Sequence, residues 1–302
     1  MTRIKPPFQE MSLLMKLLLR FRANGLAWAF RRAFVPVSTS ALVLEVGSGG
    51  NPFFRSNILC DAYMETRERH FDPLTHDRPT ILAYVENLPF KDNSMDFVVA
   101  CHVLEHSKEP EQFLSELQRV AKAGYIECPD AFFERLTCYL DHRLEVTDID
   151  DTLIIRKKKD YIQDQEVNAL FRHKVGVVFS KIVKHFPFHF NVRYFWSKES
   201  GGISYKVLNS QDKIDWESPI TDNKVYTSRS LKSVLRTAVI RLLRRILSQN
   251  RRNRCLNVFH YLMCIKCKQS DFEIHQVHIL CKSCGATYQR LDHNIIDFTQ
   301  PK

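Results

Sequence analysis

Short apolar runs alternate with amphipathic stretches through the middle of this chain. One such stretch, residues 111–120, has apolar side chains at positions 113, 114, 117 and 120, the spacing of a helix that packs one face on a sheet. The apolar runs have the length of buried strands and lie at residues 43–46, 57–61, 80–84, 96–101 and 124–128. This alternation predicts an α/β fold with a doubly wound, Rossmann-like, mostly parallel sheet.

Other segments carry weaker patterns. Residues 10–34 have helical spacing with basic residues interrupting a broad apolar face, which fits either a helix packed on the sheet or one lying on a membrane surface. Residues 143–147 and 152–157 flank a turn and predict a hairpin, and residues 203–207 alternate like a late strand. The aromatic-rich residues 158–199 are expected to form an insertion that packs over a ligand cleft.

The first apolar run leads directly into the turn Gly47-Ser48-Gly49-Gly50. Glycine is needed after a strand where φ is positive or where a Cβ would collide with a ligand, so this turn indicates a nucleotide-like ligand. Only residues 51–56 separate the turn from the second run, too few for the usual crossover helix. The second run ends in Asp61, closer to the turn than the acid of the common pattern.

Two later motifs sharpen this picture. The sequence E-N-L-P-F at residues 86–90 and the sequence M-D-F-V-V-A-C-H-V-L-E-H at residues 95–106 follow the glycine turn in order, and a further strand at 124–129 comes after them. Together they resemble class I S-adenosylmethionine-dependent methyltransferases of the type 11 kind, strongly over residues 41–130 and weakly over residues 131–210. The resemblance implies S-adenosylmethionine as the cofactor.

The resemblance also implies roles for single residues. Glu45 would bind the amino group of the cofactor, the glycine turn would lie against its tail and ribose, and Asp61 would accept the ribose hydroxyls. Tyr63 or Met64 would wall the adenine, whereas Tyr84 stands where the family commonly has an aspartate. The cofactor-binding residues expected in this way are Glu45, Gly47, Ser48, Gly49, Gly50, Asp61, Glu86, Asn87, Leu88, Cys101 and His102.

Methyl transfer is an in-line displacement, so most of its acceleration can come from positioning. A general base is needed only where the acceptor must lose a proton, and the candidates after the fourth strand are His102 and His106, with Glu105 between them. His106 fits a structural capping or packing role equally well. Asp130 is a weaker candidate for acceptor binding, because it follows the fifth strand at the edge where such sheets bind ligands.

Four of the nine cysteines form two C-x-x-C pairs, Cys264 with Cys267 and Cys281 with Cys284. This spacing predicts a closed four-cysteine zinc site that is structural, since a segment this short lacks the core to fold unaided. Redox pairs or independent thiols are the alternative. The run after Cys281 resembles the small zinc-ribbon proteins that activate tRNA, rRNA and release-factor methyltransferases, with a partial match.

The chain carries a formal net charge of +10, and its excess of basic residues lies in one place. Residues 229–254 hold nine Lys or Arg and no acid, which leaves the rest of the chain nearly neutral. Residues 231–247 read as a basic amphipathic helix that lies on anionic lipid, approaches nucleic acid or bridges two domains. Neither a secretory signal nor a membrane-spanning run is expected, so the predicted location is the cytoplasm, with peripheral membrane contact through this segment.

These patterns predict four regions: a helical segment at 1–40, a methyltransferase domain at 41–210, a linker with the basic helix at 211–254, and a zinc ribbon at 255–302. The favoured function is methyl transfer to a small-molecule or cell-envelope, lipid-linked acceptor. An RNA or protein methyltransferase that uses the ribbon and basic helix for recognition is one alternative. A cofactor-binding scaffold without turnover is the other.

Overall fold

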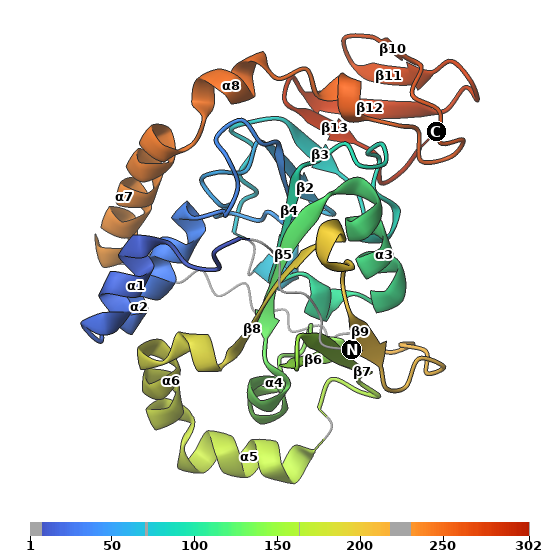
Figure 1. Cartoon of the computed structure of the whole chain (residues 1–302). Helices are drawn as coiled ribbons and strands as arrows, with labels where there is room; N and C mark the ends of the chain where they lie inside the picture. The colour runs from blue at the N-terminus through green and yellow to red at the C-terminus, as the bar shows by residue number, and fades with distance from the viewer. Residues whose placement is uncertain (1–7, 70–71, 163, 218–230, 302) are drawn as a thin grey trace.

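A computed structural model describes residues 8–69, 72–162, 164–217 and 231–301. Five parallel strands form the centre of its main sheet in the order β3-β2-β1-β4-β5, as the sequence predicts for a doubly wound fold (Figure 1). Their bounds are β1 Val43–Val46, β2 Ile58–Asp61, β3 Thr80–Leu82, β4 Phe97–Cys101 and β5 Ala123–Pro129. The chain order reverses between β1 and β4, which is where sheets of this kind bind their ligands.

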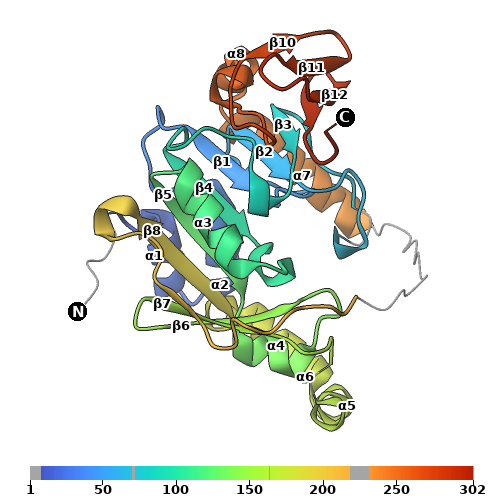
Figure 2. The ribbon, with the colours of Figure 1, turned by 90° about the vertical axis from the view of Figure 1, so that its right-hand side faces the viewer.

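Helices cover both faces of this sheet (Figures 1 and 2). Helix α3, Pro110–Val120, buries Phe113 and Leu117 in the same apolar cluster as Val98 and Ile126 of the strands. On the other face lie α1, Leu13–Arg20, α2, Asn24–Phe30, and a 3₁₀ turn at Arg31–Ala33. The helical pattern at 10–34 is therefore two helices, because Arg22 adopts a left-handed φ of 58° and breaks the first.

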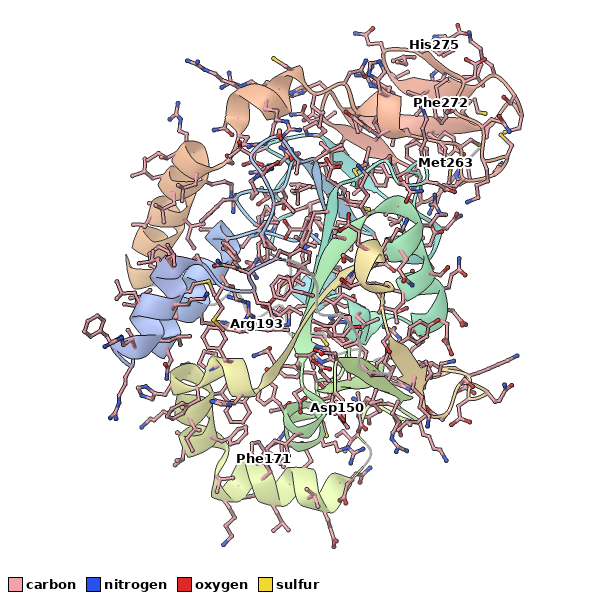
Figure 3. The ribbon with its side chains drawn as sticks, viewed as in Figure 1. Asp150, Phe171, Arg193, Met263, Phe272 and His275 are labelled. Carbon is pink, nitrogen blue, oxygen red and sulfur yellow. The ribbon has the colours of Figure 1, made fainter. Side chains whose placement is uncertain are left out.

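The region after β5 lies at the carboxyl edge of the parallel strands (Figure 1). It holds α4, Ala131–Thr137, α5, Gln165–Lys174, and α6, Gly176–His185. The expected hairpin is confirmed as β6, Leu144–Ile149, and β7, Thr152–Lys157, with Asp150 at its turn (Figure 3). The late strand is β9, Tyr205–Val207, and it pairs with β7 in a separate small sheet.

The end of the aromatic-rich insertion is itself a strand of the main sheet. Strand β8, Asn191–Ser197, runs antiparallel to β5, and its Trp196 is fully buried. Gly124 on β5 makes room for that indole, since a Cβ there would lie 2.6 Å from Trp196 Nε1. The aromatic composition of this segment therefore comes in part from a core strand.

The C-terminal ribbon extends the same sheet. Its strands are β10, Phe272–Ile274, β11, His278–Cys281, β12, Thr287–Asp292, and β13, Ile295–Asp297. Strand β13 runs parallel to β3 with Ile296 opposite Ile81, and Ile296 and Phe298 are buried in the main apolar cluster. Met263 lies where the ribbon approaches α3 (Figure 3), and its N–H donates to the Pro89 carbonyl at 3.0 Å. The ribbon is thus joined to the sheet by strand pairing and by a shared core.

Residues 47–57 connect β1 to β2 without any helix. Helix α8, Asn250–Cys255, which follows α7, Leu231–Leu247, contacts the residues that lead into β1 and β2. Asn57 Nδ2 donates to Asn253 Oδ1 at 2.8 Å, and the Arg252 guanidinium donates to the carbonyls of Thr39 and Ala41. Among the described residues, no helix has the length and apolarity needed to cross a membrane.

Candidate functional site

The turn after β1 has the backbone conformation that its glycines permit. Gly47 and Gly49 have φ of 62° and 57°, in the left-handed region that side chains disfavour. A Cβ on Gly47 would also lie 2.6 Å from Cβ of Val103, which follows β4. The turns after β1 and β4 therefore touch at the point where the strand order reverses.

Asp61 at the end of β2 holds this turn in place. One of its carboxylate oxygens accepts the N–H of Gly49 at 3.0 Å. The other oxygen accepts the N–H of Tyr63 at 3.1 Å and the Arg69 guanidinium at 2.8 Å. The carboxylate is 7% exposed, so the residue expected to bind ribose hydroxyls is here paired with an arginine.

The segment that carries Arg69 lies over the glycine turn. Thr75 donates its N–H to the Gly49 carbonyl at 3.0 Å and its hydroxyl to the Gly50 carbonyl at 2.8 Å. A Cβ on Gly50 would approach the Pro73 carbonyl at 3.0 Å. From α7, Arg244 approaches Thr75 Oγ1 at 3.3 Å, so residues from two distant segments contact the turn.

Tyr63, one of the two residues expected to wall the adenine, lies next to the turn and contacts Tyr84. Tyr63 and Tyr84 are 42% and 45% exposed, and their rings meet edge to face with centroids 5.9 Å apart. Burial, together with the neighbouring Tyr84 hydroxyl, raises the pKa of Tyr63 to about 12. Met64 is also exposed. Two flat apolar surfaces are therefore presented beside Asp61.

The remaining loop residues are engaged in the fold. Glu86 accepts the Ser107 hydroxyl at 2.5 Å, and Asn87 accepts Lys268 of the ribbon at 2.7 Å. Leu88 is fully buried, and so is the hydroxyl oxygen of Ser48. The loop after β3 thus contacts the ribbon as well as the segment after β4.

Glu45 points into the protein from the middle of β1. Its Oε2 accepts the N–H of Phe53 at 2.8 Å and the hydroxyl of Ser56 at 2.6 Å, which ties the helix-free connection to the strand. Burial raises its pKa to about 7, against the opposing effect of these bonds and of Arg32. Its role as a cofactor ligand stays a prediction.

His102 follows β4 in a left-handed conformation, with φ of 56°, which is uncommon outside glycine. Its ring lies 3.4 Å from Glu105 and 3.3 Å from Glu127. Burial acts to lower the pKa of His102, but these two carboxylates raise it to about 9. A histidine with that pKa is charged at neutral pH and has no lone pair for accepting a proton.

Sequence reasoning missed Glu127 and its partner Arg31. Glu127 is fully buried on β5 and receives the Arg31 guanidinium in a two-pronged pair at 2.7 to 3.0 Å, and it also accepts Tyr125 and Cys101. Burial would raise the pKa of Glu127, but His102 and Arg31 hold it well below its usual range. The sequence feature that could have indicated this pair is the acidic Glu127 within the apolar run 124–128.

His106 lies on a 3₁₀ turn, Leu104–His106, and not at the start of α3. Its Nδ1 contacts the Asp141 carbonyl at 3.0 Å, and burial lowers its pKa. Its ring meets that of His142, a residue that the sequence analysis did not single out. Asp130 caps α4 by accepting the N–H of Phe132 and also accepts the Thr147 hydroxyl, so both its oxygens serve the fold.

The four cysteines of the two C-x-x-C pairs converge. Their sulfur atoms all lie within 4.8 Å of one another, with Cys264 to Cys284 at 3.6 Å and Cys267 to Cys281 at 3.5 Å. The Tyr288 hydroxyl lies 2.9 Å from the Cys264 sulfur. Two knuckles separated in sequence therefore form one cluster of thiols.

This geometry can be compared with known proteins. Residues 59–126 match the methyltransferase domain family. The matched part runs from β2 to β5 and includes Asp61, the loop after β3 and His102. The match and the sheet order support a class I methyltransferase domain. Among the curated proteins, none matches the chain.

Several solved structures are similar to parts of the chain. A SAM-dependent methyltransferase from Aquifex aeolicus is 20% identical over 30% of this chain and 57% of its own, with a TM-score of 0.24. A complex that contains the Haloferax volcanii Trm112 methyltransferase activator is 17% identical over 45% of this chain and 74% of its own, with a TM-score of 0.30. The YcgJ protein of Bacillus subtilis is 17% identical over 42% of this chain and 70% of its own, with a TM-score of 0.29. The chain thus spans just over half the length of the Aquifex methyltransferase.

Glu45 generates a prediction about stability. Its pKa is about 7 in the folded chain and about 4.3 in an unfolded one. The folded state therefore keeps a proton that the unfolded state loses. The stabilisation is complete below about pH 4 and is lost as pH rises through about 7, a change of about 4 kcal/mol. Glu45→Gln should remove this part of the pH dependence, measured as the free energy of unfolding by denaturant from about pH 5 to 8.

The matched control is Glu166→Gln, an exposed acid on α5. This variant should keep the pH dependence of the wild type. Equal slopes in the wild type and in Glu45→Gln would show that the buried carboxyl does not titrate in this range.

Proposed function

We propose that the chain transfers a methyl group from S-adenosylmethionine to an acceptor. The observation that carries this proposal is the bond from the Gly49 N–H to Asp61, which fixes a glycine turn and an acid side by side. They lie at the carboxyl ends of β1 and β2, next to the reversal in strand order. The family match over residues 59–126 supports it.

The surroundings of the turn have the chemistry that this cofactor requires. The Tyr63 and Tyr84 rings offer apolar faces for adenine, and Asp61 offers acceptors for the ribose diol. His102, at the end of β4, would flank the reacting centre. Because the displacement is in line, holding the acceptor close to the methyl group is the main contribution needed from the protein. The catalytic roles of His102 and His106 stay predictions.

Arg69 makes this proposal sharply testable. Its guanidinium takes the Asp61 oxygen that a ribose hydroxyl would use, at 2.8 Å. Asp61→Ala should abolish binding of S-adenosylhomocysteine, whereas Arg69→Ala should strengthen it. Release of the Asp61 oxygen from an ion pair worth about 1 kcal/mol corresponds to about fivefold in affinity. Isothermal titration calorimetry measures both effects.

Arg172→Ala, a change on the exposed face of α5, is the control and should bind like the wild type. Tight binding by Asp61→Ala would remove Asp61 from the cofactor site. Failure of every folded variant and of the wild type to bind would overturn the methyltransferase proposal. Binding by the wild type without methyl release on any acceptor favours the scaffold alternative.

We infer that the cysteine cluster holds a structural zinc ion. Four thiolates at about 2.3 Å from a tetrahedral zinc lie about 3.8 Å apart, close to the 3.5 and 3.6 Å separations found here. Cys264, Cys267, Cys281 and Cys284 would hold the ion, and the Tyr288 hydroxyl would donate to Cys264. With four protein ligands the site is closed, so its contribution is to folding and not to the reaction.

Cys281→Ser should therefore contain one zinc fewer per chain than the wild type, measured by inductively coupled plasma mass spectrometry. Amide exchange should accelerate in β13 and in β3, since their pairing depends on the folded ribbon. Cys255→Ser, an exposed cysteine outside the cluster, should keep the zinc content and the exchange rates of the wild type. Equal zinc content in both variants would argue against the four-cysteine site.

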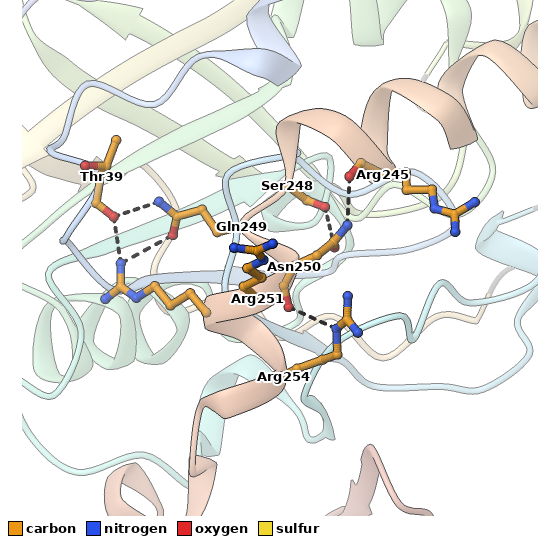
Figure 4. Close-up of a pocket in the computed structure, with 8 residues that line it drawn as sticks. Thr39, Arg245, Ser248, Gln249, Asn250, Arg251 and Arg254 are labelled. Carbon is orange, nitrogen blue, oxygen red and sulfur yellow. Dashed lines mark hydrogen bonds between the residues drawn. The ribbon is translucent and has the colours of Figure 1, made fainter.

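We further propose an acceptor at an anionic membrane surface. Helix α7 exposes large apolar side chains, with Leu242 and Ile246 at 59% and 67%. Next to them, α8 and the residues that precede it line a pocket of about 660 Å³ (Figure 4). Its lining residues are Thr39, Arg245, Ser248, Gln249, Asn250, Arg251, Arg252 and Arg254. Apolar side chains beside arginines suit a layer of anionic headgroups over acyl chains.

The wild type should therefore sediment with phosphatidylglycerol-containing vesicles and not with purely zwitterionic ones. Ile246→Asp should weaken this binding about tenfold, since one large side chain no longer enters the bilayer. Val277→Asp changes an equally exposed apolar residue on the ribbon and should bind vesicles like the wild type. Salt-sensitive binding to RNA without any vesicle binding would favour the nucleic-acid alternative.

A further inference from the structure

A second cluster of metal-ligating side chains lies near the glycine turn and is not used by the proposal above. Glu105 and His106 come from the 3₁₀ turn after β4, and His142 comes from the loop between α4 and β6. One ligand atom of each lies within 4.8 Å of the others. The cluster sits at the carboxyl edge of the sheet, where folds of this kind bind their substrates.

Glu105 lacks the partners that a buried carboxylate needs. It is 2% exposed, and neither of its oxygens has a hydrogen-bond partner among the residues described by the structure. Its ion-pair contact is His102 Nδ1 at 3.4 Å, beyond good hydrogen-bonding distance. A buried carboxylate left in this state costs several kcal/mol. The position is therefore complementary to a cation.

The two histidines have the hydrogen-bond partners that metal-binding histidines have. Nδ1 of His106 contacts the Asp141 carbonyl at 3.0 Å, and Nδ1 of His142 contacts the Glu134 carboxylate at 2.7 Å. Both partners only accept, so Nδ1 carries the proton in each ring and Nε2 keeps its lone pair. Metal-binding histidines typically have such an acceptor behind them, which fixes the ring and its tautomer.

The support behind His142 is itself held firmly. Glu134 is 2% exposed, and its other oxygen accepts the ammonium group of Lys158 at 2.9 Å. This arrangement keeps the Glu134 carboxylate facing the imidazole. Glu68 lies 3.7 Å from Nδ1 of His106 and is partly exposed.

The neighbouring trio Cys101, His102 and Glu127 also has ligand atoms close together, but it does not fit a metal. Glu127 already receives two bonds from the Arg31 guanidinium, which supplies the positive charge that a metal would bring. Glu105 has no arginine partner, and its charged neighbour His102 is shared with Glu127. Of the two sites, the trio Glu105, His106 and His142 is the one with free ligand capacity.

We propose that Glu105, His106 and His142 bind a divalent transition-metal ion. Two imidazoles and one carboxylate are a ligand set typical of zinc, manganese, cobalt and iron(II). Three protein ligands leave coordination positions for another group, as in catalytic metal sites. A second step rests on the proposed methyl transfer. We infer that an oxygen-bearing acceptor takes one of the open coordination positions of the metal and is held there beside the cofactor.

The test counts bound metal in the full-length protein. The wild type, Glu105→Gln, His142→Ala and His185→Ala are equilibrated with Zn²⁺, and separately with Mn²⁺. Bound zinc is measured by mass spectrometry and bound manganese by electron paramagnetic resonance. His185 is an exposed histidine on α6 and serves as the control. The ion at the four cysteines is common to all four proteins and cancels in the comparison.

We expect the wild type and His185→Ala to bind one ion per chain more than Glu105→Gln and His142→Ala. Equal metal content in all four proteins, for both ions, would overturn the proposal. Where a ligand variant fails to fold, nitrogen NMR of the histidine rings in the wild type tests whether the ion is bound there. Zn²⁺ should shift Nε2 of His106 and His142 and leave His185 unchanged, and the absence of those shifts overturns the proposal equally.

Calorimetry with S-adenosylhomocysteine on the same samples separates this proposal from the methyltransferase proposal. Metal binding without cofactor binding would leave the metal site standing and remove the methyltransferase function. Cofactor binding with no additional ion would do the reverse. We expect His142→Ala to lose the ion and to keep the cofactor affinity of the wild type, which would place the ion on the acceptor side.

Discussion

The short connection between β1 and β2 is the constraint on which the rest of this structure depends. Adjacent parallel strands normally have a helix between them that covers one face of the sheet. Here residues 47–57 form no helix, and α8 from the far end of the chain contacts the residues that lead into β1 and β2 through Arg252 and Asn253. The same connection is tied to β1 by the bonds from Phe53 and Ser56 to Glu45. The glycine turn itself is contacted by Thr75 and by Arg244 of α7, so residues distant in sequence help to position it.

The ribbon meets a related requirement at the edge of the sheet. An edge strand exposes unpaired backbone groups, and β13 pairs with those of β3. The contact continues along the loop after β3, where Lys268 of the ribbon donates to Asn87. The ribbon that the cysteine cluster belongs to therefore contacts a loop that is expected to line the cofactor site. The strands of the ribbon, β10 to β13, therefore belong to the same sheet as the parallel strands.

Local patterns predicted the elements whose signal is local. The strands around β1 and β4, the hairpin β6–β7 and the convergence of the cysteines follow from periodicity and spacing. Strand β8 was missed because its aromatic side chains read equally well as an insertion. The pairing of Arg31 with Glu127 and the approach of His142 to Glu105 join residues far apart in the chain. Such contacts are set by the topology, and no single-sequence pattern contains them.

Three buried glutamates show how the protein treats charge in its interior. Glu127 is neutralised by Arg31, and Glu45 accepts two hydrogen bonds and has a pKa of about 7. Both are satisfied within the fold. Glu105 is as deeply buried but receives no hydrogen bond from the described residues. The nearest cation of the described chain is the His102 ring, which lies 3.4 Å from Glu105 and is shared with Glu127. Because a fold tolerates an unsatisfied buried carboxylate only where something else compensates it, Glu105 is the one of the three that keeps capacity for a cation from outside the chain.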